Sequence, residues 1–224
     1  YGGNYKSYGP QYPRGIQEGN GVPADGDLWV SYSVNKEDMW ISRIPVPVEI
    51  NASAHADDDF SKNKSIAELT DWNIYSPVWA PVSLEDQWLK LQDKDPFDYA
   101  KVERKIPASK ELKVSFDLKA GQNDKGTLQI EFLDENGIVC SRMELTDDGI
   151  FRLKGGSRFA NMMKYEAGKV YHVEAVLSTV DRNIQVYVDG KRVGLRMFYA
   201  PVAAVERIVF RTGVPRTFPT VDTP

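Results

Sequence analysis

Aromatic side chains gather between residues 72 and 99, and side chains of this type are able to stack on sugar rings. The cluster contains Trp72, Tyr75, Trp79, Trp88 and Tyr99. The electron-rich face of an aromatic ring attracts the C–H groups on one side of a sugar ring. The same residue types also fill cores and join domains, and this is the commoner use of each one taken alone. The cluster therefore predicts a carbohydrate-binding surface at Trp72, Trp79, Trp88 and Tyr99, with packing as the alternative.

Three carboxylates follow one another closely in the same stretch, at Asp93, Asp95 and Asp98. Calcium takes about six to eight oxygen ligands, and a loop that offers several carboxylates and carbonyls suits it. The run lacks the glycine and the final glutamate of an EF-hand loop, so a hydrogen-bonded turn is the alternative. Apart from one structural Ca²⁺ ion at these residues, we expect no cofactor.

Basic residues form a local strip at Arg152, Lys154, Arg158 and Lys164. A strip of this kind is either a solvated face or a contact surface for an anionic glycan. The chain as a whole has 224 residues and a net charge of −4. This balance argues against a nucleic-acid partner, which requires an excess of lysine and arginine. No apolar run approaches the roughly 20 residues of a membrane-spanning helix, so we expect no membrane span.

One cysteine is present, Cys140, so no disulfide forms within the chain. It lies in a strand-like pattern, where a lone cysteine behaves as a small buried apolar residue. A catalytic thiol needs a neighbouring histidine, and the chain has two histidines in all.

The elements that must position these residues are almost all strands. Residues 26–48 are expected to form a hairpin of two alternating strands around a polar turn, ended by Pro45 and Pro47. From residue 71 onward, apolar and polar residues alternate in short runs. The expected strands are 72–75, 88–92, 100–105, 111–119, 126–133, 138–145, 150–153, 170–178, 183–188 and 205–211. Residues 51–70 are expected to be a polar linker with one helical turn at 66–69, and its acidic residues 57–59 to be solvated.

Hairpin turns are indicated at Asn136-Gly137, Asp147-Asp148-Gly149 and Asp189-Gly190, because these residue types tolerate the positive φ of a type I′ turn. About ten strands with such turns and no convincing helix predict an all-β protein. The economical architecture is a two-sheet antiparallel β-sandwich.

Two resemblances to known families refine this interpretation. Residues 10–16, 18–21 and the hairpin that begins at Asp27 resemble the last blade of a sialidase-like (BNR-repeat) β-propeller. The closest likeness is to large secreted bacterial proteins in which such a propeller precedes a β-sandwich. Residues 171–176 and 181–193 resemble the paired strands of a concanavalin A-like or laminin-G-like jelly roll.

The first resemblance implies roles for three residues in an intact parent protein. Arg14 would hold an anionic group, Glu18 would act as acid/base or activate a partner, and Tyr12 would be the nucleophile. The alternative is that these are loop residues that form ion pairs at the surface.

Four segments and three possible functions follow from the resemblances. The segments are 1–50, resembling the last blade, the linker 51–70, the sandwich 71–213 and a tail 214–224. We expect a non-catalytic accessory module of a polysaccharide- or glycoconjugate-degrading protein, which binds carbohydrate or stabilises the propeller. One alternative is part of a sialidase-like glycoside hydrolase whose catalytic propeller is mostly absent from this chain. The other is a structural or adhesive module without a sugar ligand. The implied partners are a carbohydrate, an anionic glycan among them, and the parent's propeller, in an extracellular or periplasmic location.

A sandwich that is itself a glycosidase or lyase is disfavoured. A retaining enzyme needs two carboxylates close together, and Glu131 and Asp117 stand alone on their expected strands.

Overall fold

The structure, a computed structural model, describes residues 10–16, 28–34, 38–44, 56–95 and 98–213. The chain divides into two compact units, and each is described by itself. Unit 1 comprises Tyr1–Asn51 with Arg216–Pro224, and unit 2 comprises Ala52–Pro215. No helix in the described part of the chain is long and apolar enough to cross a membrane.

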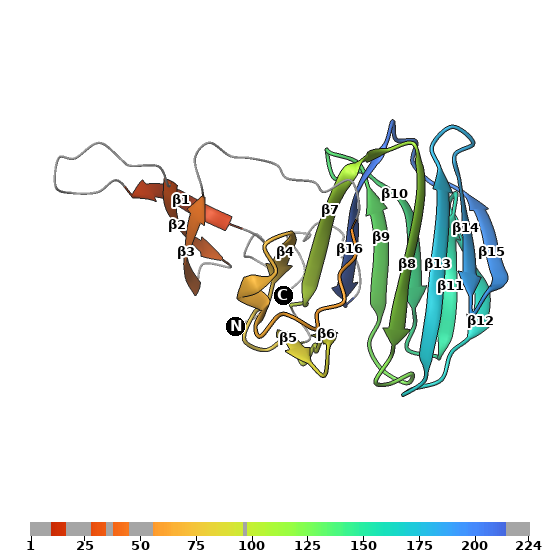
Figure 1. Cartoon of the computed structure of the whole chain (residues 1–224), viewed down its shortest axis with the longest axis horizontal. Helices are drawn as coiled ribbons and strands as arrows, with labels where there is room; N and C mark the ends of the chain where they lie inside the picture. Colours follow the sequence, from red (N-terminus) through yellow and green to blue (C-terminus); the bar gives the residue numbers. More distant parts are fainter. Residues whose placement is uncertain (1–9, 17–27, 35–37, 45–55, 96–97, 214–224) are drawn as a thin grey trace, which may run out of the picture. The chain divides into compact units, whose positions relative to one another are not determined.

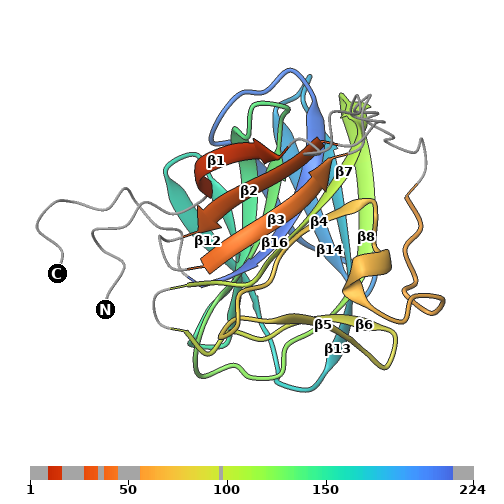
Figure 2. The same ribbon diagram turned by 90° about the vertical axis from the view of Figure 1, so that its left-hand side faces the viewer.

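Unit 1 contains a three-stranded antiparallel sheet in the order β1-β2-β3 (Figure 2). The strands are β1 (Pro10–Ile16), β2 (Leu28–Val34) and β3 (Asp38–Ile44). The expected hairpin is confirmed, since β2 pairs with β3 from Leu28↔Ile44 to Val34↔Asp38. Strand β1 was not expected. Its register with β2 shifts between Gln11 and Arg14, where Tyr12 has a φ of 52°. Such a bulge breaks the alternation by which a strand is recognised in a sequence.

Unit 2 consists mainly of two antiparallel sheets, and Figure 1 shows them face to face. The seven-stranded sheet has the order β12-β11-β10-β9-β16-β7-β4, and the four-stranded sheet the order β15-β14-β13-β8. This confirms the predicted all-β antiparallel sandwich. The bounds are β4 (Trp72–Tyr75), β7 (Lys101–Ser109), β8 (Glu111–Lys119), β9 (Leu128–Leu133), β10 (Val139–Leu145), β11 (Ile150–Gly155), β12 (Arg158–Lys164), β13 (Val170–Ser178), β14 (Asn183–Val188), β15 (Lys191–Met197) and β16 (Val205–Thr212).

The main core lies between the two sheets, and alternation places its side chains there. Ile184, Val186 and Val188 of β14 are buried, as the sequence predicted. Ile130 and Phe132 of β9 meet them from the other sheet in the same cluster. Residues between these on each strand must point to the opposite face, because successive strand side chains alternate. This alternation creates the outer face of the seven-stranded sheet.

A second core covers the part of the wide sheet that the four-stranded sheet cannot reach. It is built on Ala80, Val82, Ala100 and Val102, with Trp72 packed against them. The covering elements are the hairpin of β5 (Val82–Glu85) and β6 (Trp88–Leu91) and the 3-10 helix η2 (Ile66–Glu68). The helix confirms the turn expected at residues 66–69. This second core explains how a seven-stranded sheet pairs with one of four strands.

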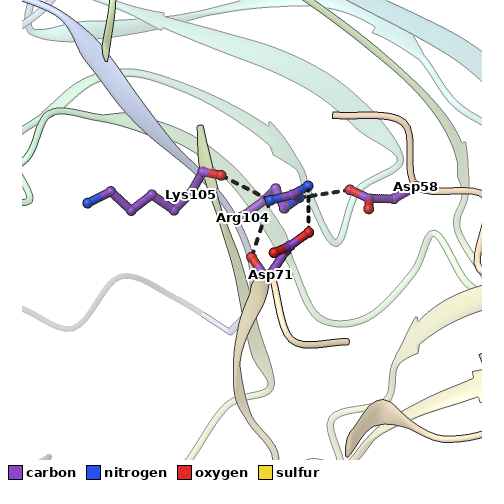
Figure 3. A network of polar contacts seen from close by, with 4 residues as sticks. All are labelled: Asp58, Asp71, Arg104 and Lys105. Atoms are coloured by element: carbon purple, nitrogen blue, oxygen red, sulfur yellow. Dashed lines mark hydrogen bonds and ion pairs between the residues drawn. The ribbon is translucent and has the colours of Figure 1, made fainter. Parts of the chain in front are cut away.

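A buried arginine fastens the predicted linker to this second core (Figure 3). Arg104 of β7 is turned toward the core side, and its side chain is 6% exposed. Its Nε donates to the Asp58 carboxylate at 2.8 Å, and a second nitrogen donates to the Asp71 carboxylate at 3.3 Å. The same guanidinium also donates to the main-chain oxygen of Lys105 at 3.1 Å. Asp58 is therefore an ion-pair partner of unit 2 and not merely a solvated linker residue.

The three hairpin turns lie at the predicted positions, but only one of them is a type I′ turn. Asp189 and Gly190 both have positive φ, at 49° and 77°, and join β14 to β15 as a two-residue type I′ turn. At Asn136-Gly137 only the glycine has positive φ, and the Asp134 carboxylate accepts from the main chain of Asn136 and Ile138. The type I′ prediction at that turn is wrong, because the Asp134 side chain supports a longer loop.

Candidate functional site

The outer face of the seven-stranded sheet carries two rows of polar side chains that run across the strands. The pairing registers place them opposite one another. The first row is Tyr75, Lys101, Arg211, Gln129, Glu144, Arg152 and Asn161. The second row is Asn73, Glu103, Val209, Glu131, Arg142, Lys154 and Phe159. Glu103, Gln129, Val209, Glu131 and Glu144, in the middle of the rows, are buried. At the β11–β12 end, Arg152, Lys154 and Phe159 are half-buried and Asn161 is exposed, so the face is more open at this end.

Ion pairs hold the carboxylates of both rows in fixed positions. The Glu131 carboxylate accepts from Arg142 at 2.6 Å and lies 3.9 Å from Arg211. Glu144 pairs with Arg152 at 2.9 Å. The side chains of Glu131 and Glu144 are only 9% and 7% exposed, so these are sheltered pairs between directly facing or adjacent residues. Glu103 pairs in the same way with Lys101 at 2.8 Å and with Arg207. Each of the three carboxylates of the rows, on Glu103, Glu131 and Glu144, is thus paired with a cation.

At the β12 end of the rows, a lysine lies against two aromatic rings. The Lys154 ammonium is 4.4 Å from the ring centre of Tyr199 and 5.7 Å from that of Phe159. The Arg152 guanidinium lies over the same Phe159 ring at 4.3 Å. Tyr199 is brought here by its main-chain N–H, which donates to the carbonyl of Cys140 at the start of β10. Attraction between each cation and the π face orients the rings.

Buried polar atoms without a partner concentrate on this face. Both amide atoms of Gln129 are buried without a hydrogen-bond partner in the described part of the chain, and so are Nε of Arg211 and Nε of Arg207. Gln129 is fully buried. A buried polar group normally finds a partner, so each such group calls for a water or a ligand atom.

The phenol of Tyr199 stays neutral at physiological pH. Burial, the main cause, raises its pKa from 10.0 to about 12, and the neighbouring Glu131 carboxylate raises it further while Arg142 opposes the rise. The Tyr199 hydroxyl is therefore available as a donor and adds no negative charge to this end of the face.

The four predicted sugar-stacking residues lie in different surroundings. Trp72 belongs to the second core, with its ring centre 5.8 Å from that of Phe60, so its contacts fit the packing alternative. Trp88 is half-buried on β6. Tyr99 is half-buried, with its ring centre 5.3 Å from that of Tyr75 and 5.4 Å from the Arg211 guanidinium, which brings it to one end of the first row. The structure does not gather the four into a single surface.

Trp79 is the exposed member of this set, with 66% of its surface accessible. Its loop is ordered by two main-chain hydrogen bonds. The Ala80 N–H donates to the carbonyl of Pro77, and the Lys94 N–H donates to the carbonyl of Trp79. An exposed indole on an ordered main chain is a second platform on which a sugar ring could stack.

The carboxylates proposed for calcium are engaged in hydrogen bonds. Asp93 accepts from the Thr212 hydroxyl at 2.9 Å and from the main chain of Asp95. Asp98 accepts from the Tyr75 hydroxyl at 3.0 Å. Within the described residues, no group of three or more His, Cys, Asp or Glu side chains is arranged to hold a metal ion. The calcium site stays a prediction.

The residues assigned catalytic roles by the propeller resemblance lie in unit 1. Tyr12 and Arg14 are exposed on β1, and the hydroxyl of Ser31 donates to the main-chain oxygen of Arg14 at 3.5 Å. Glu18 lies outside the described residues. Their catalytic role stays a prediction. Asp117 and Glu131 lie on different sheets, so they do not form a carboxylate pair.

Two residues of the outer-face site were predicted from the sequence. The basic strip included Arg152 and Lys154, and these two side chains do share the outer face, while Arg158 and Lys164 are exposed elsewhere on β12. Phe159 and Tyr199 were missed. Phe159 lies on β12, whose pairing with β11 shifts in register between Phe151 and Arg152 of β11. Tyr199 lies in the loop after β15. Alternation along residues 158–164 could have placed Phe159 on the same face as Lys154. No sequence pattern indicated the position of Tyr199, because it lies in a loop.

The fold and this face define an antiparallel β-sandwich protein with a charged sheet surface flanked by aromatic rings. The family described as "Sialidase-like, CBM domain" matches residues 72–224, about two thirds of the chain. The chain therefore belongs to this family of carbohydrate-binding modules of sialidase-like proteins.

Solved structures agree with this assignment. A structure named "Sialidase" is 91% identical over the whole chain, with a TM-score of 0.88, and the chain spans 21% of that protein's length. Apo Crh5 transglycosylase matches with a TM-score of 0.58 and 12% identity over 72% of this chain and 70% of its own, which shows a shared fold alone. No curated protein sequence matches the chain.

Proposed function

We propose that this chain is a non-catalytic module that binds carbohydrate through the outer face of its seven-stranded sheet. The observation that carries the proposal is the arrangement of Phe159, Lys154 and Tyr199. Two half-buried rings, each with a cation over one face, stand next to hydrogen-bonding side chains of the rows. Sugar recognition needs this combination, because a sugar ring has apolar faces and a polar rim.

Ring substitutions test this proposal. Phe159→Leu and Tyr199→Leu keep the apolar bulk but remove the π face, so we expect each to weaken glycan binding at least about tenfold. Glycan-array binding by the full chain would identify a ligand, and titration calorimetry would measure the variants. Thermal unfolding of each variant shows that it is folded.

Trp79→Leu is the matched control and also tests a second platform. We expect it to leave the affinity within about twofold, because Trp79 lies outside the two rows. If Trp79→Leu abolishes binding while Phe159→Leu and Tyr199→Leu do not, the Trp79 loop is the binding site and our placement is wrong. If the folded chain binds no glycan, the proposed function itself is rejected.

The wider setting is part of the proposal. Family membership and a relative named a sialidase support a parent protein that acts on sialylated glycans. The hairpin and β1 are consistent with a blade of a BNR-repeat propeller, which the sandwich would stabilise, in a secreted bacterial protein of the periplasm or extracellular space. In the intact parent, Tyr12, Arg14 and Glu18 would take part in catalysis by the propeller. The module itself would hold one structural calcium ion at Asp93, Asp95 and Asp98.

A further inference from the structure

The charges of the two outer-face rows do not balance. The rows carry three carboxylates, on Glu103, Glu131 and Glu144, and five cations. The cations are Lys101, Arg142, Arg152, Lys154 and Arg211. The whole chain has a net charge of −4, so this positive surplus is local to the face. A local surplus attracts a ligand of the opposite charge.

The positive surplus falls on Lys154, which is half-buried. The other four cations each pair with a carboxylate of the same rows. In the described part of the chain, no carboxylate lies within ion-pair distance of the Lys154 ammonium, and its neighbours are the rings of Tyr199 and Phe159. Arg142 lies directly opposite Lys154 in the register, so an anion at Lys154 lies near a second positive charge.

The buried middle of the face contains polar atoms without hydrogen-bond partners in the described part of the chain. Gln129, which neighbours Glu144 and Arg211 in the first row, is fully buried, and neither its amide NH₂ nor its amide oxygen has a partner in the described part of the chain. Nε of Arg211 is likewise buried without an acceptor. The Tyr199 phenol is neutral at physiological pH and repels no anion. In the second row Lys154 has neighbouring rings and no carboxylate partner in the described part of the chain, and an anionic group at its ammonium supplies the missing counter-charge.

Resting on the proposed function, we propose that the outer face takes an acidic glycan. Its carboxylate or sulfate group lies at the Lys154 ammonium, and the sugar ring that bears this group lies against Tyr199 or Phe159. The ion pairs of Glu131 and Glu144 keep the acidic side chains of the rows from competing for Lys154.

Matched pairs of immobilised oligosaccharides test the proposal with the full chain. The probes are galacturonate oligomers and their methyl esters, sialyllactose and lactose, and sulfated and desulfated chondroitin oligosaccharides. We expect the acidic member of a pair to bind at least about tenfold more tightly, with an affinity that falls as salt rises. Binding confined to the first two pairs identifies a carboxylate as the anion, and binding confined to the chondroitin pair identifies a sulfate.

Substitution of Lys154 locates the anion. Lys154→Met keeps the aliphatic stem and should reduce affinity for the acidic glycan at least about tenfold, whereas Lys154→Arg should restore most of it. Lys119→Met removes the same charge from the four-stranded sheet and should change the affinity less than about twofold.

The outcomes separate the two proposals. If a neutral oligosaccharide binds as tightly as its acidic partner, or Lys154→Met behaves like Lys119→Met, the acidic-glycan inference is overturned while carbohydrate binding stands. If the folded chain retains no member of any pair, the proposed function fails together with the inference.

Discussion

At the scale of single residues, Arg104 illustrates how a charged group is accommodated on the core side of a sheet. Arg104 shares the core-facing side of β7 with Val102 and Ile106, and its side chain is accordingly only 6% exposed. Burial of a charge is costly unless the charge is paired and its donors are satisfied. Asp58, Asp71 and the Lys105 carbonyl supply those partners (Figure 3). The arginine thus joins the segment before β4 to the sandwich.

We expect Arg104→Ala to lower the free energy of unfolding by about 1–3 kcal/mol. The loss is smaller than for a fully buried pair, because the side chains of Asp58 and Asp71 are 28% and 47% exposed and regain water. Urea unfolding followed by tryptophan fluorescence measures the change. Arg158→Ala, an exposed arginine on β12, is the matched control and should stay within about 0.5 kcal/mol. Equal effects of the two substitutions would contradict a special role for Arg104.

At the scale of elements, the edge of the sandwich closes because two glycines let strands from different sheets approach. A Cβ on Gly155 of β11 would lie 2.7 Å from Cβ of Arg196 on β15. A Cβ on Gly194 of β15 would lie 2.8 Å from the sulfur of Met162 on β12. Distances this short force one strand to move unless the neighbour is a flexible side-chain end. Met162 is flexible and Cβ of Arg196 is not, so Gly155 is the stricter of the two positions.

Gly155→Ala is therefore expected to destabilise the protein by about 1–3 kcal/mol, as overpacking does in a close-packed interior. Differential scanning calorimetry would show it as a lower unfolding temperature. Gly121→Ala is the control, because nothing lies within 4 Å of its added Cβ and its φ is not positive. If Gly155→Ala is as stable as Gly121→Ala, the close approach of β11 and β15 is not required.

At the scale of the whole molecule, two buried acids make the stability of the fold depend on pH in the alkaline range. Burial raises the pKa of the Cys140 thiol from 9.0 to about 12 and that of the Tyr199 phenol from 10.0 to about 12. Between pH 9.0 and about 12 for the thiol, and between pH 10.0 and about 12 for the phenol, the group ionises in the unfolded chain while the folded chain keeps it protonated. The unfolded state then binds fewer protons, so stability falls as pH rises through this window.

We expect the free energy of unfolding to be unaffected by these two groups below about pH 9 and to decline steadily above it. Urea unfolding at about pH 8, 9, 10 and 11 would follow the decline. Cys140→Ala removes the thiol and should reduce the decline most between about pH 9 and 10, because the phenol of the unfolded chain reaches half ionisation only at its pKa of 10.0. An unchanged curve in Cys140→Ala would show that Cys140 ionises alike in both states.

Strand alternation made much of this fold predictable from the sequence. Residues 72–75, 111–119, 170–178 and 183–188 were predicted to the residue, because alternate side chains of each strand are turned toward a core. Four strands were missed. The pairing of β1 with β2 and of β12 with β11 shifts in register. Strand β5 has only four residues, and the edge strand β15 has Gly194 in its interior. Local pattern is weak in such strands, and their pairing partners determine that they form.

The sequence by itself determined the all-β class, the turn positions and which residues alternate between core and surface, since these depend on neighbours along the chain. It also contained the basic residues Arg152 and Lys154 and the exposed Trp79. Only the tertiary structure decided that Tyr199, from a loop, lies beside Lys154 and that Trp72 lies in a core. A candidate face built across seven strands depends on the order in which those strands pair. That order is set by contacts between residues far apart in sequence, which no local pattern records.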